Sequence, residues 1–254
     1  MSVEVTEDAA LGGRLRLKQP RRGHRVGHDA ILLAAACPAR AGERVVDLGA
    51  GVGAAGLALA LRVEGIEVVL VEVDAGLARL AAQNAQLNGL GARVNAAVLD
   101  VAAPARAFAA AGLGPESVAR VLMNPPFNDP ARQRASPDRR RRLAHAGPVG
   151  ALAVWIKTAA RLLRPRGTLT MIWRADGLAE VLQALAPAFG AATVLPVHSG
   201  EEEAAVRVLV RATKASHAPL VLLPGFVLND RAGRPTARAE SVLRAGAALP
   251  LSEI

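Results

Sequence analysis

The feature that most restricts the fold is a short apolar strand that runs directly into a run of glycines. Residues 45–49 read VVDLG, and residues 49–56 read GAGVGAAG before an apolar helical pattern continues. Glycine adopts backbone conformations that other residues avoid and lets a ligand approach the main chain closely. A strand, a glycine turn and a helix in this order predict one unit of an α/β sheet with a nucleotide-binding turn.

The same alternation continues along the chain. Apolar runs typical of buried strands recur at residues 66–73, 93–101, 118–123 and 168–173. Helical patterns lie between them, which predicts a mostly parallel sheet covered on both faces. Residues 192–197 and 204–210 are separated only by a polar turn, so this pair is expected to be antiparallel. We therefore predict a seven-stranded, mostly parallel Rossmann-like α/β sheet with an antiparallel last strand and helices on both faces.

No internal repeat and no linker composition divides the 254 residues. We expect a single domain, residues 1–254. Residues 1–40 are expected to form an N-terminal hairpin and a helix, because residues 12–27 alternate leucine with basic residues and residues 28–36 are apolar. The core follows at residues 41–212, and residues 213–254 form a C-terminal extension able to add a strand and a helix.

Composition argues against membrane and metal classes. No apolar stretch reaches the roughly 18 uncharged residues that a membrane helix needs, and residues 1–10 are acidic rather than basic, so a cytoplasmic protein is expected. Cys37 is the only cysteine, and the five histidines are scattered without ligand spacing. We therefore predict no disulfide and no metal site.

The net charge of +9 favours a polyanionic partner, because clustered cations release counterions from phosphates. Nearly all of this charge is arginine, since lysine occurs only at Lys18, Lys157 and Lys214. Abundant arginine and alanine also fit a GC-rich genome. The placement of the arginines is therefore more informative than their number.

Two cofactors are compatible with the glycine turn, which carries Gly49, Gly51 and Gly53. Residues 51–56 satisfy G-x-G-x-x-G, and Glu72 follows about 20 residues later, as in dinucleotide-binding dehydrogenases. Asp47, however, ends the strand before the glycines, where a carboxylate would repel a pyrophosphate but accept hydrogen bonds from an ammonium group or a bound water. This charge favours S-adenosylmethionine.

The next two strand ends carry acids that suit the same cofactor. Glu72 ends the second strand, where its two oxygens are placed to accept the two ribose hydroxyls. Asp100 follows the third strand and is placed to accept from the adenine amino group. Each acid alone is typical of a solvated strand end or a helix cap, but acids at three consecutive strand ends favour a ligand site.

The fourth strand ends on Asn124, Pro125, Pro126 and Phe127. The two prolines fix φ and remove two donors, which leaves a stiff segment of carbonyl acceptors. The Asn124 side-chain oxygen and the Pro125 carbonyl are placed to accept the two N–H groups of a planar amine, and Phe127 offers a stacking face for a base. Pro-Pro alone would only end a strand; the flanking asparagine and aromatic residue favour catalysis.

These motifs carry a family resemblance. DLGAGVG, VEVD, LD and NPPF, spread over residues 44–174, resemble the motifs of class I S-adenosylmethionine-dependent methyltransferases that modify exocyclic or amide NH2 groups. Residues 26–38, VGHDAILLAAACP, are similar to an element of bacterial tRNA adenine-N6 methyltransferases that act on valine tRNA. That resemblance implies that Gly27 and Asp29 lie against the methionine end of the cofactor. The chain departs from the family pattern at His28, Ala30 and Phe127, and the NPPF form also occurs among ribosomal RNA methyltransferases.

An arginine run follows the proposed catalytic segment directly and includes Arg139, Arg140, Arg141 and Arg142. Such runs are usually solvated loops. At the mouth of a site for a nucleobase, a cationic loop is instead placed to meet a phosphate backbone. We predict RNA, most directly tRNA, as the partner, and basic residues at positions 14–25 are expected to extend the same surface.

The leading interpretation is adenine-N6 methylation of RNA. A protein-glutamine N5-methyltransferase presents the same planar NH2 group, but usually carries an N-terminal helical domain that about 40 residues before Val45 would not build. A ribosomal RNA base N-methyltransferase is a further alternative, and a DNA adenine methyltransferase would need a recognition domain. A dehydrogenase leaves NPPF unexplained, and a binding module with a vestigial site leaves the intact acids and Asn124 unexplained.

Overall fold

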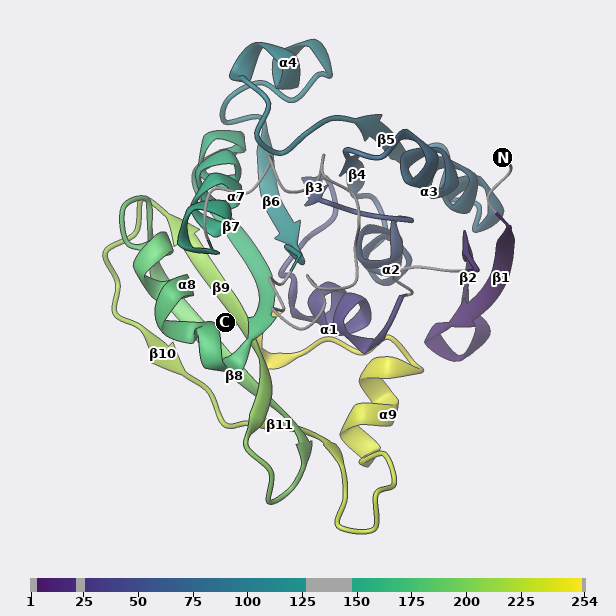
Figure 1. Cartoon of the computed structure of the whole chain (residues 1–254), viewed down its shortest axis with the longest axis vertical. Helices are drawn as coiled ribbons and strands as arrows, with labels where there is room; N and C mark the ends of the chain where they lie inside the picture. Colours follow the sequence, from purple (N-terminus) through teal and green to yellow (C-terminus); the bar gives the residue numbers. More distant parts are fainter. Residues whose placement is uncertain (1–3, 22–25, 127–147, 253–254) are drawn as a thin grey trace.

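The computed structural model describes residues 4–21, 26–126 and 148–252. Within these residues, nine strands form one sheet in the order β10-β8-β9-β7-β6-β3-β4-β5, with β11 paired to β8 (Figure 1). The parallel part consists of β3 (Arg44–Leu48), β4 (Glu67–Glu72), β5 (Val94–Val98), β6 (Val118–Met123) and β7 (Leu163–Arg174). Strand β3 pairs in parallel with both β4 and β6, which confirms the predicted mostly parallel sheet.

The antiparallel pair lies where the short polar turn predicts it. Strand β9 (Ala205–Lys214) runs antiparallel between β7 and β8 (Phe189–Gly200). The C-terminal extension then adds β10 (Val221–Leu222) and β11 (Phe226–Asn229), both parallel to β8, beyond the seven predicted strands. An antiparallel strand inserted at this point distinguishes the sheet from that of dinucleotide-binding dehydrogenases, whose six strands are all parallel.

Helices cover both faces of the sheet. One face carries α1 (His28–Ala36), α2 (Ala54–Arg62) and α3 (Ala75–Leu87); the other carries α4 (Ala105–Ala110), α7 (Pro148–Leu162) and α8 (Leu178–Leu185). Between α8 and β7 lies the short 3-10 helix η2 (Ala175–Gly177). Because strand side chains alternate, Leu70 and Leu122 join the first layer, while Val71 and Met123 join the second. None of the helices in the described ranges is long and apolar enough to cross a membrane.

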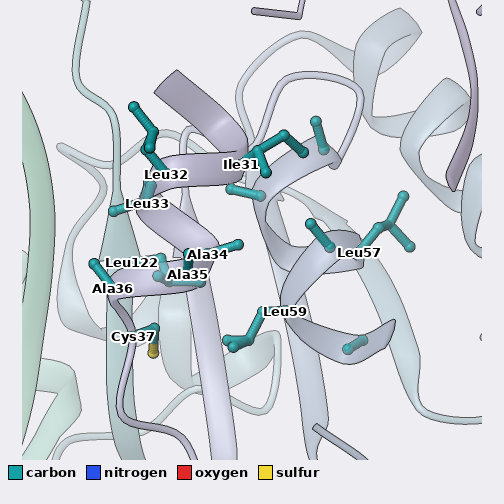
Figure 2. Packing of buried hydrophobic residues seen from close by; sticks show 14 of the residues in the cluster. Ile31, Leu32, Leu33, Ala34, Ala35, Ala36, Cys37, Leu57, Leu59 and Leu122 are labelled. Carbon is teal, nitrogen blue, oxygen red and sulfur yellow. The ribbon is translucent and has the colours of Figure 1, made fainter. Parts of the chain in front are cut away.

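Helix α1 is apolar on nearly all sides because it is enclosed on nearly all sides. Its residues from Ile31 to Ala36 are buried, beside Leu57 and Leu59 of α2 and Leu122 of β6 (Figure 2). The C-terminal extension continues through α9 (Ala237–Leu243) and η3 (Pro250–Ser252) and closes over this helix. There Leu249 donates its backbone N–H to the carbonyl of Ala35 over 2.9 Å. Residues 28–36 therefore form the predicted helix as a central element.

The N-terminal hairpin forms as predicted. Strand β1 (Val5–Ala10) turns through η1 (Leu11–Gly13) and pairs along its whole length with β2 (Leu15–Pro20). Leu15 and Leu17 of β2 are fully buried in the same hydrophobic cluster as Ala81 and Ala85 of α3. The hairpin consequently lies against α3, on the far side of the molecule from the β8–β10 edge (Figure 1).

Candidate active site

The glycine turn joins the carboxyl end of β3 to α2. Gly49, Gly51 and Gly53 have φ values of +69°, +57° and +90°, a region that side-chain-bearing residues rarely adopt. The turn is tied to the neighbouring strand because Ala50 donates its N–H to the Val71 carbonyl over 2.9 Å. A Cβ placed on Gly51 would meet no atom within 4 Å, so the main chain here borders open space. A ligand can therefore approach the backbone of the turn directly.

Trp155 of α7 forms one wall of this turn. A Cβ on Gly49 would lie 2.4 Å from the indole ring, far inside van der Waals contact. The indole thus fills the space that a side chain at position 49 would need, and glycine is required there both for its φ and for this contact. Sequence reasoning missed Trp155; the only signal was the scarcity of aromatic residues, six in the chain.

Glu72 links the second strand to the glycine turn. Its side chain is 8% exposed, and its two oxygens each accept one backbone N–H at 2.9 Å, from Gly51 and from Asp74. A carboxylate oxygen accepts more than one hydrogen bond, so each retains capacity for a further donor such as a ribose hydroxyl. The two backbone bonds hold the carboxylate in a fixed orientation at the end of β4.

Asp47 is buried beneath the turn. Its side chain is 2% exposed, and Oδ2 accepts the N–H of Gly56 in the first turn of α2 over 2.9 Å. Burial raises the pKa of Asp47 to about 7, the Gly56 bond opposes that rise, and the nearby charge of Glu72 adds to it. Asp47 therefore fixes the junction between the glycine turn and α2. Its predicted contact with the ammonium group or a bound water stays a prediction.

Asp100 lies two residues beyond β5 and is exposed. Its Oδ1 accepts the backbone N–H of Ala102 over 2.8 Å, which holds the carboxylate in a tight turn. The side chain keeps further acceptor capacity toward solvent. The carboxyl ends of β3, β4 and β5 lie side by side, so the structure brings the three predicted acids to one edge of the sheet.

Asn124 lies at the same edge, next to the glycine turn. Strands β3 and β6 pair in parallel with Leu48 opposite Met123, so the next residues along, Gly49 and Asn124, leave the sheet side by side. Asn124 is half-buried, Pro125 is buried and Pro126 is exposed. Phe127 and the arginine run at 139–142 lie outside the described residues.

Gly27 and Asp29 lie at the start of α1 and line a pocket of about 440 Å³. Its other walls come from β8, β9 and β11, with Val197, Val206 and Leu228 among them. Asp29 pairs with Arg207 of β9, with Oδ2 and Nε 3.0 Å apart and both side chains about one-third exposed. Arg207 lies opposite Arg174, the last residue of β7, so this pocket borders the same carboxyl edge as Asn124.

The side chains at this edge fit S-adenosylmethionine. Gly51 offers open backbone for close approach, Glu72 offers fixed acceptors for a diol, and Asp100 offers an acceptor for an amino group. Across residues 4–21, 26–126 and 148–252, no three histidine, cysteine or acidic side chains gather as metal ligands would. The donors and acceptors present are those of a nucleoside site.

Comparison with known proteins agrees with this geometry. A family model described as a methyltransferase small domain matches residues 24–200. A tRNA1(Val) (adenine(37)-N6)-methyltransferase from Tolumonas auensis is 30% identical over 179 residues, which are 70% of this chain and 70% of the relative. A release factor glutamine methyltransferase from Chlorobaculum tepidum is 32% identical over 160 residues, 59% of this chain and 52% of that protein.

A solved structure extends the likeness to nearly the whole chain. A predicted O-methyltransferase from Agrobacterium tumefaciens is 32% identical and superposes with a TM-score of 0.74 over 87% of this chain and 98% of that one. The predicted fold, enzyme class and cofactor, S-adenosylmethionine, are confirmed. The chain belongs to the methyltransferase small domain family, class I enzymes that use S-adenosylmethionine.

Proposed function

We propose that the protein methylates the N6 atom of an adenine in RNA, with tRNA as the substrate. The observation that carries the proposal is the position of Asn124, which leaves β6 beside Gly49 at the edge where the glycine turn meets open space. A group held by Asn124 is therefore next to the cofactor turn. The half-buried asparagine and the buried Pro125 form a stiff segment whose acceptors have a fixed direction.

The chemistry of an exocyclic amine explains why acceptors are needed. The nitrogen lone pair is delocalised into the ring, so the amine is a poor nucleophile. When the Asn124 Oδ1 and the Pro125 carbonyl each accept one N–H, the nitrogen moves toward tetrahedral geometry and its lone pair points away from both acceptors. When bound, S-adenosylmethionine would supply the methyl group and leave as S-adenosylhomocysteine, and the methylated nitrogen would release one proton to solvent. Catalysis by this segment is mostly orientation, which can contribute several kcal/mol.

RNA is the substrate class that the relatives and the charge favour together. Relatives from Tolumonas, Enterobacter, Erwinia and Bacteroides are all named tRNA1(Val) (adenine(37)-N6)-methyltransferases. The arginine run at 139–142 follows the catalytic segment, where it would meet the phosphates on either side of a flipped base. Phe127 supplies the stacking face for that base. Gly27 and Asp29, at the start of α1, would hold the methionine end of the cofactor.

One relative supports a second candidate, a protein-glutamine N5-methyltransferase, because a release factor glutamine methyltransferase is 32% identical over 160 residues. A carboxamide presents the same planar NH2 group to Asn124 and Pro125. The two functions share the cofactor turn and the catalytic segment. They differ in the polymer that carries the amine, and an experiment on the acceptor separates them.

The test is a methyl-transfer assay with tritiated S-adenosylmethionine. Total tRNA, ribosomal RNA and release factors are taken from a strain that lacks the protein, and labelled RNA is digested to nucleosides. We expect label in N6-methyladenosine from tRNA. The control is tRNA from a strain that makes the protein, whose target is already methylated and which should accept little label. Label confined to release factor, or to ribosomal RNA, would refute the tRNA assignment.

A further inference from the structure

Three arginines of the N-terminal hairpin pair with other groups of the fold. Arg16 pairs with Glu7 over 2.5 Å across the β1–β2 ladder, and Arg21 pairs with Glu4 just beyond the end of this ladder. Arg14 donates to the carbonyl of Ala245 in the C-terminal extension over 2.7 Å. The side chains of Arg16 and Arg21 are 57% and 60% exposed, so the contact of this hairpin with RNA stays a prediction. The hairpin is also attached to the body of the protein.

Asn84 of α3 and Asn88, the residue directly after α3, attach β2 to the body of the protein by backbone hydrogen bonds of the kind that a neighbouring strand would make. The side chain of Asn88 accepts the N–H of Arg16 over 2.9 Å and donates to its carbonyl over 2.7 Å. One helical turn earlier, Asn84 does the same with Lys18, at 2.7 Å and 3.0 Å. Because Arg16 and Lys18 are two apart, they face the same side of β2, and the asparagines, four apart, face the same side of α3.

Asn84 makes one bond that Asn88 does not. Its Nδ2 also donates to the carbonyl of Val52 over 3.0 Å, inside the glycine turn between Gly51 and Gly53. Asn84 is fully buried, and its amide uses its two N–H donors and its oxygen in these three bonds. A single side chain thus connects the backbone of the hairpin to the backbone of the turn.

The same strand also supports the segment that leads into α1. Gln19 of β2 is 3% exposed, and its Oε1 accepts the backbone N–H of Val26 over 3.0 Å. Its Nε2 donates to Asp8 of β1 over 2.8 Å, which fixes the amide orientation. Val26 precedes Gly27 at the start of the α1 pocket. Strand β2 therefore contacts both the glycine turn, through Asn84, and the entry to α1, through Gln19.

We propose that Asn84 is a positioning residue for the cofactor and that the N-terminal hairpin is a brace for the glycine turn. By holding the Val52 carbonyl, Asn84 keeps Gly51 and Gly53, on either side of it, in their left-handed conformations before the cofactor arrives. Hairpin attachment and cofactor affinity are then coupled through one amide. The proposal rests on the cofactor alone, so it holds for any methyl acceptor.

The test compares two variants that each lose three hydrogen bonds. Asn84→Ala loses two bonds to Lys18 and the bond to Val52; Asn88→Ala loses two bonds to Arg16 and one to the Asn84 carbonyl. S-adenosylmethionine affinity is measured by isothermal titration calorimetry without any acceptor, well below the unfolding temperature of each variant. We expect Asn84→Ala to raise Kd about five- to tenfold, the effect of one or two lost hydrogen bonds, and Asn88→Ala to change it less than twofold.

The binding stoichiometry separates positioning from misfolding. A positioning role raises Kd and the KM for S-adenosylmethionine while the fraction of competent molecules and kcat stay near those of the wild type. A purely structural role lowers the competent fraction with Kd unchanged, and this result overturns the proposal, as do equal effects in the two variants. If Asn84→Ala does not fold, Asn84→Ser takes its place, because its small neutral side chain adds no buried charge.

Discussion

The buried carboxyl group of Asp47 predicts a distinctive dependence of stability on pH. Burial raises its pKa from 3.8 to about 7, with the charge of Glu72 acting in the same direction and the Gly56 N–H opposing it. Asp47→Asn keeps the shape of the side chain and an oxygen that can accept the Gly56 N–H, but it cannot ionise. The substitution therefore isolates the free energy of burying the charge.

The magnitude follows from linkage between protonation and folding. The folded carboxyl group keeps its proton up to about pH 7, whereas the unfolded one loses it near pH 3.8. Between these values the folded state binds more protons, so the free energy of unfolding falls as pH rises. About three pH units at ~1.4 kcal/mol each give at most about 4 kcal/mol. This contribution is fully present below about pH 4 and is lost as pH rises through about 7.

The assay is urea unfolding of the wild type and of Asp47→Asn at closely spaced pH values from 4 to 8. The free energy of unfolding of the wild type minus that of the variant is expected to decrease by up to about 4 kcal/mol across this range, and to level off above pH 7. Taking the difference removes the titration of groups that do not interact with Asp47. A difference that stays constant with pH, or that increases, would falsify the assignment of this charge burial to Asp47.

Three further predictions concern the turn, the sheet and the arginine run. In urea unfolding, Gly49→Ala should lower the free energy of unfolding by about 1–3 kcal/mol more than Gly89→Ala. Both glycines have φ +69°, but only a side chain at position 49 would meet Trp155. Equal losses in the two variants would refute the contact. Glu43→Gln should lower the free energy of unfolding by about 3 kcal/mol in the same measurement. The Glu43 carboxylate pairs with Arg120 over 2.7 Å, and both side chains are only about 12% exposed. A loss under about 0.5 kcal/mol would contradict this prediction. Replacing the four arginines at 139–142 with serine should weaken tRNA binding, measured by fluorescence anisotropy. The slope of the logarithm of the binding constant against the logarithm of the salt concentration should become less steep by about 3. An unchanged slope would mean that the run does not contact the phosphates.

Much of the fold could be predicted from the sequence because apolar periodicity reports burial directly. Residues 28–36 form the expected helix, and the short turn before β9 forced the antiparallel pair. Helix α4 was not predicted, because six residues with one buried phenylalanine carry too little periodicity. Strand β10 has two residues, and only its pairing with β8 makes it a strand.

Site residues at the ends of strands could be predicted from the sequence, whereas residues that act through tertiary contacts could not. Asp47, Glu72 and Asn124 could be placed because strand ends align at one edge of a parallel sheet. Trp155 and Asn84 could not, since each acts through a contact with a segment far away in the sequence. The pairing of Arg16 with Glu7 of β1, and of Arg21 with Glu4, could not be predicted either, because it depends on how the two strands of the hairpin are aligned. The expected contact of these arginines with RNA stays a prediction.

We infer that Asn124 orients the acceptor amine while the glycine turn and the acids hold the cofactor. Asn124→Ala is therefore compared with the wild type in single-turnover methyl transfer to tRNA and in calorimetric titration with S-adenosylmethionine. If Asn124 orients the amine, the transfer rate falls at least about a hundredfold, ~3 kcal/mol of lost orientation, and the Kd for the cofactor changes less than threefold. A parallel loss of cofactor affinity and transfer would mean that Asn124 only supports the fold, and transfer at the wild-type rate would contradict the mechanism.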